Sequence, residues 1–228
     1  MKNTNRRCVT VWMRFFLIVM MVGSLASCKP KPSIVLLDTS CEPPCWHDIT
    51  PGMSTKKDVI AILPKIPEVA PNSVEDTAIT TGGIHDHIKW RFDSGSGDFG
   101  GTTFFKDGAV STIEIRPKKG ALMLDDAIRK LGEPELTFAY LERGEIDRMI
   151  IYLLYPTKGY ALTYDIGYSR DGSAAVEPTH PIEHVYFFDP KLFDELVTIG
   201  PLGYQDPATL KQNMRPWKGY GDIFYFEK

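Results

Sequence analysis

The sequence lacks the signatures of several common enzyme families. It contains no G-x-S-x-G elbow, no H-E-x-x-H and no G-x-x-x-x-G-K-[ST] loop, and the G-x-G-x-x-G spacing at 95–100 lies in a loop with no expected helix after it. These absences argue against α/β-hydrolase, zincin, P-loop and dinucleotide-binding chemistry. We therefore expect a protein that is not an enzyme and that carries no cofactor.

Positive charge is scarce outside the N-terminal segment. The formal net charge is -3, yet the first 27 residues hold four basic residues and no acid: Lys2, Arg6, Arg7 and Arg14. The remaining chain has 22 basic and 29 acidic residues, which is a net charge of -7. Such a mildly acidic body lacks the basic patch that nucleic acid requires, so we expect no nucleic-acid partner.

The N-terminus has the pattern of a secretory signal peptide. Its basic residues precede a short apolar run over 15–22 and small residues over 23–27. The apolar run is too short for a comfortable transmembrane helix. The end of this segment, Leu25-Ala26-Ser27-Cys28, resembles the bacterial lipobox. An uncleaved anchor helix is the alternative interpretation.

The lipobox resemblance implies a lipid anchor on Cys28. In that family the cysteine thiol receives a diacylglyceryl group and becomes the new N-terminus after cleavage. More than one acyl chain gives stable anchoring. The resemblance thus implies an extracytoplasmic lipoprotein of the cell membrane or outer membrane, whose membrane contact is the lipid on Cys28.

The spacing of the segments predicts the domain organisation. We expect a signal peptide over 1–27, a tether over 28–40, a first unit over 41–117 and a second unit over 118–228 with a C-terminal helix. Cys28 and Cys41 are 13 residues apart, so the tether spans at most about 40–45 Å when fully extended. The folded units would stay close to the membrane, and a partner would be an envelope protein.

Two helical segments repeat along the chain. Residues 52–63 and 120–131 align at an offset of 68, with identical residues at four of twelve positions. Two unrelated amphipathic helices with similar caps are the alternative. The segment 49–63 resembles the helix of BamE-like outer-membrane-assembly lipoproteins, and Leu131-Gly132-Glu133-Pro134 is similar to the L-G-x-P that closes it. Leu63-Pro64 departs from that ending in the first unit.

The BamE resemblance implies a fold and a class of function. β-lactamase-inhibitor-protein-like domains share the fold, which is α+β. It would consist here of two repeats of a short helix packed on an antiparallel β-sheet. These domains bind other proteins by shape and share no catalytic residues.

Alternating apolar residues and turn signals predict the strands. Asp107-Gly108 supplies the positive φ angles of a tight hairpin turn between two of them. The aromatic run over 220–226 predicts one more strand or a strap. The expected strands are 84–92, 102–105, 110–115, 136–141, 149–155, 160–166 and 184–188.

Cys41 and Cys45 remain after the leader is removed, in a compartment that permits disulfides. They predict a local disulfide that pins the tether to the first unit. Together with His47 they also match a soft-metal or thiol-redox site, because two thiolates and an imidazole suit such metals. We expect no metal under the first interpretation, and the second stays open.

Histidines and tyrosines offer two further sites. His85 and His87 share a strand face, and with His180 and His184 they would form a metal site only if the two segments met. Ordinary surface histidines are the alternative. A dense set of tyrosines predicts a binding face on the sheet, although core packing also explains it. The residues of that face are Tyr152, Tyr160, Tyr164 and Tyr186.

These observations converge on one leading function. We expect a membrane-anchored, extracytoplasmic lipoprotein that acts as a non-catalytic protein-binding or scaffolding module of the cell envelope. The alternative is a metal-handling or thiol-redox lipoprotein that uses Cys41, Cys45 and His47.

Overall fold

The structure is a computed structural model, in which part of the chain is placed well enough to describe. The described residues are 41, 44–77, 86–93, 100–142, 148–167, 175–194, 197, 207–222 and 226–227. All of them belong to one compact unit, Pro32–Lys228. The predicted signal peptide, Cys28, the tether over 28–40 and His85 lie outside the described residues.

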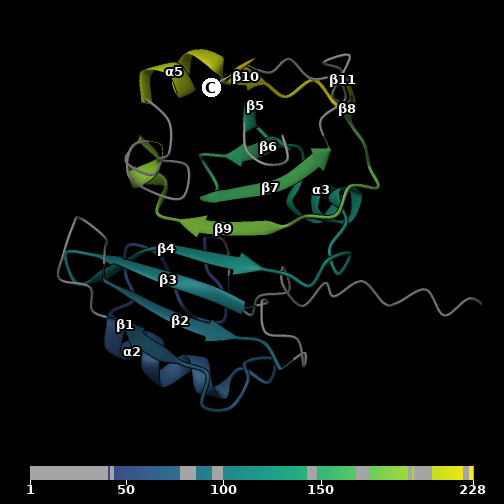
Figure 1. The fold of residues 1–228 in the computed structure, drawn as a ribbon. Coiled ribbons are helices and arrows are strands. Elements are labelled where there is room, and N and C mark those ends of the chain that lie inside the picture. The colour runs from purple at the N-terminus through teal and green to yellow at the C-terminus, as the bar shows by residue number, and fades with distance from the viewer. Residues whose placement is uncertain are drawn as a thin grey trace, which may run out of the picture. The chain divides into compact units, whose positions relative to one another are not determined.

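A single large sheet dominates the fold (Figure 1). Its strands run in the order β1-β2-β3-β4-β9-β7-β6-β5-β10, and β12 also pairs with β5. Neighbours are antiparallel except for the parallel pair of β12 and β5. A separate two-stranded sheet joins β8 (Ala175–Val176) and β11 (Gly221–Asp222). The bounds of the large sheet's strands are β1 Glu75–Thr77, β2 His87–Arg91, β3 Gly100–Lys106, β4 Ala109–Arg116, β5 Leu136–Glu142, β6 Arg148–Tyr155, β7 Tyr160–Gly167, β9 His184–Phe188, β10 Arg215–Pro216 and β12 Phe226–Glu227.

The chain builds this sheet from two meanders that meet in its middle. Strands β1 to β4 follow one another in order, and β5 to β7 follow one another from the opposite side. β9 then fills the place between the two meanders, where it pairs with both β4 and β7. We call the β4–β9 pairing, in which residues 112–115 face 185–188, the seam of the sheet.

The predicted fold, two repeats of a short helix on its own antiparallel sheet, is wrong. Both sets of strands belong to one large antiparallel sheet, and the described helices are few and short. The physical reason lies at the seam, because the outer edge of β4 carries N–H and C=O groups that must find partners. β9 satisfies those groups and thereby joins the strands of the two expected units.

The two repeated segments do contain helices. α2 (Lys56–Ile62) begins after Thr55, whose side chain accepts a hydrogen bond from the Asp58 N–H while Asp58 caps Thr55 in return. α3 (Leu124–Leu131) ends at Gly132, where φ is +83°. Other short helices among the described residues are η3 (Leu63–Lys65), η4 (Pro190–Leu192) and α5 (Pro207–Asn213).

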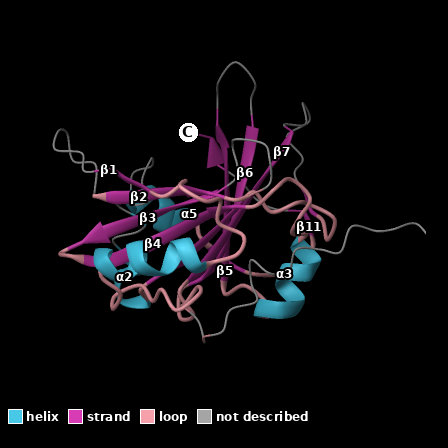
Figure 2. Ribbon diagram, turned by 90° about the horizontal axis from the view of Figure 1, so that it is seen from below, coloured by secondary structure: helices cyan, strands magenta, loops and turns pink. Residues whose placement is uncertain are grey.

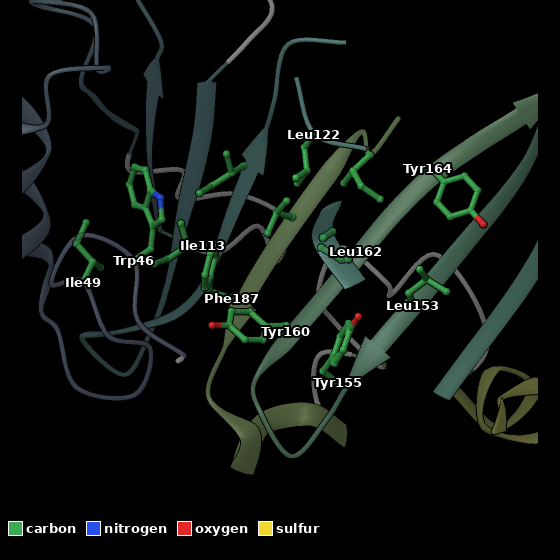
Figure 3. Close-up of a cluster of buried hydrophobic side chains, with 14 of the residues drawn as sticks. Trp46, Ile49, Ile113, Leu122, Leu153, Tyr155, Tyr160, Leu162, Tyr164 and Phe187 are labelled. Carbon is green, nitrogen blue, oxygen red and sulfur yellow. The ribbon is translucent and has the colours of Figure 1, made fainter. Parts of the chain in front are cut away.

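Both faces of the sheet carry a hydrophobic cluster. α2 and α3 lie on the same side of the sheet (Figure 2) and cover the larger cluster, to which they contribute Val59 and Leu124. The smaller cluster lies on the other face and includes Val197 and Leu210. β6 alternates between the two, which explains its unbroken apolar sequence. Figure 3 shows part of the larger cluster.

No helix within the described ranges has the length and apolar character needed to cross a membrane.

Candidate functional site

The cysteine pair lies at the start of the described chain. The structure joins Cys41 and Cys45 in a disulfide, with their Cα atoms 5.7 Å apart. Cys45 is buried, and Cys41 is partly exposed. His47, the third residue of the alternative metal site, packs its ring edge-on against Trp46 at 4.7 Å between centroids. Both thiols are therefore engaged with each other in this structure.

The described histidines have different surroundings. His87 is buried beside Phe104. The Nδ1 atom of His180 accepts a hydrogen bond from the Glu177 N–H at 3.2 Å, and burial lowers the pKa of its imidazole. In the part of the chain that the structure describes, no group of three or more His, Cys, Asp or Glu side chains is placed to hold a metal ion.

The four tyrosines of the predicted binding face divide between the two faces of the sheet. Tyr160 and Tyr164 belong to the larger cluster (Figure 3), whereas Tyr152 and Tyr186 belong to the smaller one. The most exposed of them, Tyr152, is 6% exposed. Burial raises the pKa of Tyr160 to about 12. These side chains therefore contribute to packing on two faces and do not form one surface.

A buried carboxylate crosses the seam of the sheet. The Glu114 carboxylate on β4 lies 2.8 Å from Nδ1 of His184 on β9, and the same oxygen accepts a hydrogen bond from Arg116 Nε at 2.9 Å. Burial alone would raise the pKa of Glu114. The His184 hydrogen bond and the charge of Arg116 outweigh burial, so the pKa lies below its ordinary value.

We predict that Glu114→Gln weakens the seam and changes its pH dependence. At neutral pH the loss of the charged acceptor should lower the free energy of unfolding by about 1–3 kcal/mol. The depressed pKa of Glu114 stabilises the fold above about pH 4.5, and this contribution is lost as the pH falls through the folded-state pKa. Urea unfolding between neutral and acid pH should therefore show a flatter profile for the variant. Glu133→Gln, at an exposed acid, is the control, and matching profiles for the two variants would contradict the prediction.

Asp165 and Glu183 form a second acidic contact. Burial and the hydrogen bond that the protonated Glu183 carboxyl donates to Asp165 raise the pKa of Glu183 to about 7.

A hollow lies beneath the C-terminal strap, which we define as residues 215–222. The strap leaves β10 at the edge of the large sheet and reaches β11, which pairs with β8 (Figure 1). The Trp217 N–H donates to the carbonyl of Glu135 at 3.3 Å. The Tyr220 ring packs edge-on against Trp217, and its hydroxyl donates to Asp125 of α3 at 3.3 Å. These contacts hold the strap over β5 and β8.

The hollow is open to the surface, has a volume of about 240 Å³ and has a polar and aromatic lining. Its floor is formed by the buried residues Thr137 and Val176, and its walls by the more exposed strap. Trp217 is the one aromatic residue among the described lining residues, and it also packs against the larger hydrophobic cluster. The lining residues are Thr137, Val176, Arg215, Pro216, Trp217, Lys218, Gly219 and Asp222.

The lining places cations, one acid and an aromatic ring around a concave space. Arg215 and Lys218 supply positive charge, and Asp222 supplies one negative charge. An aromatic wall with a few polar groups is the usual composition of a small-molecule site, although this hollow is smaller than most. The arrangement can hold a small polar ligand by shape and charge, and the lining residues that the structure describes include no nucleophile paired with a base.

The predicted strand or strap over 220–226 overlaps the observed strap only at residues 220–222, and the hollow was not predicted. The aromatic run over 220–226 signalled an added strand or strap, and β11 and β12 lie within or next to it. Thr137 and Val176 come from distant strands, so no local pattern linked them to Trp217. No family model matches the chain, and neither the curated proteins nor the solved structures provide a match.

Proposed function

We propose that this chain is an exported, lipid-anchored protein of the cell envelope whose folded part binds a ligand without catalysing a reaction. The observation that carries the binding role is the hollow beneath the C-terminal strap, with Trp217 in its wall. The anchoring role is supported by the sequence pattern that ends at Cys28.

The large sheet suits a rigid binding scaffold. Both of its faces are packed, and the strap is held at two places by strand pairing. A site supported by such elements keeps its shape without a ligand, which reduces the ordering cost of binding. Covalent attachment to a membrane would keep this site near other envelope components.

The anchor is tested by mass spectrometry of the N-terminal peptide. We expect the mature protein to begin at Cys28 with a diacylglyceryl group, and Cys28→Ser to abolish both cleavage and lipid. Cys8→Ser is the matched control, because that cysteine lies in the predicted leader. A mature chain that begins elsewhere, or an unmodified Cys28, would contradict the anchor.

The binding role is tested by thermal shift of the membrane-extracted protein in nonionic detergent. Low-molecular-weight fractions of the envelope should contain a component that raises the Tm of the wild type, since a ligand that binds only the folded state stabilises it. Trp217→Leu should lose this increase. Tyr220→Phe keeps the ring beside Trp217 and should retain it. Equal shifts for wild type and Trp217→Leu would place binding outside the hollow.

A further inference from the structure

We infer that the hollow beneath the strap takes a small anion with a flat, apolar body, such as an aromatic carboxylate. This inference rests on the proposed binding function and names its ligand class. It combines the size of the hollow, the aromatic wall and the distribution of charge along the strap.

The volume limits the ligand to a small molecule. About 240 Å³ corresponds to roughly eight water molecules, since each water occupies about 30 Å³ in the liquid. That space suits a single ring with one polar substituent and is below the usual range for drug-sized ligands. A long peptide or a sugar chain could place only a single ring or side chain in this space.

Trp217 supplies the contact for a flat body. It is half-buried, in contrast to Trp46 and Trp90, which are buried in the larger cluster. Its backbone bond to Glu135 and its contact with Tyr220 keep it in place. Aromatic surfaces that are already ordered add contact area at little conformational cost.

The charge of the lining favours an anion. Lys218 is exposed and makes no hydrogen bond or ion pair with any described residue. Arg215 lies in the same wall, and its Nη1 atom donates to the carbonyls of Gln212 and Met214. Among the described lining residues Asp222 is the one acid, so Arg215, Lys218 and Asp222 together contribute one net positive charge. A locally positive hollow on an acidic protein attracts anions to that place.

Binding of three ligands with the same ring tests the inference. Benzoate, benzamide and benzylamine carry charges of about -1, 0 and +1 at neutral pH. They are titrated at fixed ionic strength into the nitrogen-labelled, membrane-extracted protein, with the indole N–H resonance of Trp217 as the readout. We expect benzoate to bind with a dissociation constant in about the millimolar range. Benzamide and benzylamine should bind at least severalfold more weakly.

Two strap variants and one control test the source of the preference. Lys218→Gln should weaken benzoate binding by about two- to fivefold, and Asp222→Asn should strengthen it by a similar factor, as expected for exposed charges. Neither should change benzamide binding. Lys65→Gln removes the same charge from an exposed site on η3 and should have no effect.

Each other outcome overturns the inference. The anion preference is contradicted if benzamide binds as tightly as benzoate, or if benzylamine binds more tightly. It is also contradicted if Lys218→Gln and Lys65→Gln change benzoate binding by the same factor. If none of the three ligands shifts the Trp217 indole resonance, the proposed class of ligand is wrong. The proposed binding function fails separately, when the envelope component stabilises Trp217→Leu as much as the wild type.

Discussion

Replacing Trp46 with alanine is expected to lower the free energy of unfolding by about 3–5 kcal/mol, the usual cost of truncating a buried aromatic side chain. Trp46 is 1% exposed and stacks on Trp90, with 4.8 Å between ring centroids and 13° between planes. Its backbone exchanges two hydrogen bonds with Ile49, at 3.0 and 2.9 Å. Figure 3 shows Trp46 and Ile49 side by side in the larger cluster.

The size of this effect follows from what alanine leaves behind. The indole packs residues 44–49, the segment that contains it, against the sheet. Its removal leaves a cavity that the surrounding strands cannot easily close. The Trp46 Nε1 group has no hydrogen-bond partner among the described residues, so the loss of that buried donor offsets a small part of the cost. The contact with Trp90 should appear as a coupling of about 0.5–1.5 kcal/mol in a double-mutant cycle.

Urea unfolding followed by far-ultraviolet circular dichroism measures the Trp46→Ala effect. Met53→Ala is the control, because Met53 is 78% exposed and its truncation should change stability by less than about 0.5 kcal/mol. A loss below about 1 kcal/mol for Trp46→Ala would contradict the placement of the first described segment in the core.

Local structure could be predicted from the sequence because its causes are local. Asp107 and Gly108 have φ angles of +52° and +82°, as a tight hairpin turn requires, and β3 and β4 lie on either side of them. The segments 136–141, 149–155, 160–166 and 184–188 all correspond to strands. Their alternating or continuous apolar residues are short-range signals of burial.

The order of the strands could not be predicted in the same way. β4 and β9 pair although residues 112–115 and 185–188 are far apart in the chain. An apolar pattern indicates which residues are buried. It does not indicate which strand will pair with the edge of another strand and satisfy its backbone hydrogen bonds. The repeat of two helical segments favoured two separate sheets, whereas the exposed edges of those sheets are better satisfied by joining.

The candidate site depended on the same long-range information. Tyr160 pairs with Phe187 and Ala161 with Tyr186, so these registers place Tyr160 and Tyr186 on opposite faces. Glu114 and His184 meet only because β9 lies beside β4. The prediction of a tyrosine binding face assumed that all four side chains lie on the same face of the sheet. The register of strand pairing decides which face each side chain takes, and no sequence pattern specified that register.

Gly159→Ala should lower the free energy of unfolding by about 2–5 kcal/mol, for two separate reasons. Gly159 has a φ of +73°, and a side chain in the left-handed region costs about 1–2 kcal/mol. An added Cβ would also lie 2.4 Å from the carbonyl oxygen of Phe188 and 2.6 Å from Cβ of Pro44. Overpacking of this kind costs about 1–3 kcal/mol more.

The surrounding contacts leave little room for relief. The Gly159 N–H donates to the carbonyl of Tyr155 at 2.9 Å, and the Gly159 carbonyl accepts from the Phe188 N–H at 2.9 Å. Hydrogen bonds therefore hold the backbone of this turn, which joins β6 and β7, both to the end of β6 and to β9. Pro44 is the movable neighbour, so relaxation would displace the segment next to Cys45.

Gly108→Ala separates the two contributions. Gly108 also lies in a hairpin turn with a positive φ, +82°, but nothing lies within 4 Å of an added Cβ. This control should lose only the strain of about 1–2 kcal/mol. The excess loss in Gly159→Ala then measures the steric contact with Phe188 and Pro44. Hydrogen exchange should also show faster opening of residues 44–49 in Gly159→Ala alone, because Pro44 is the neighbour that must move. Equal losses in the two variants, with unchanged exchange at 44–49, would show that the first described segment does not pack against this turn.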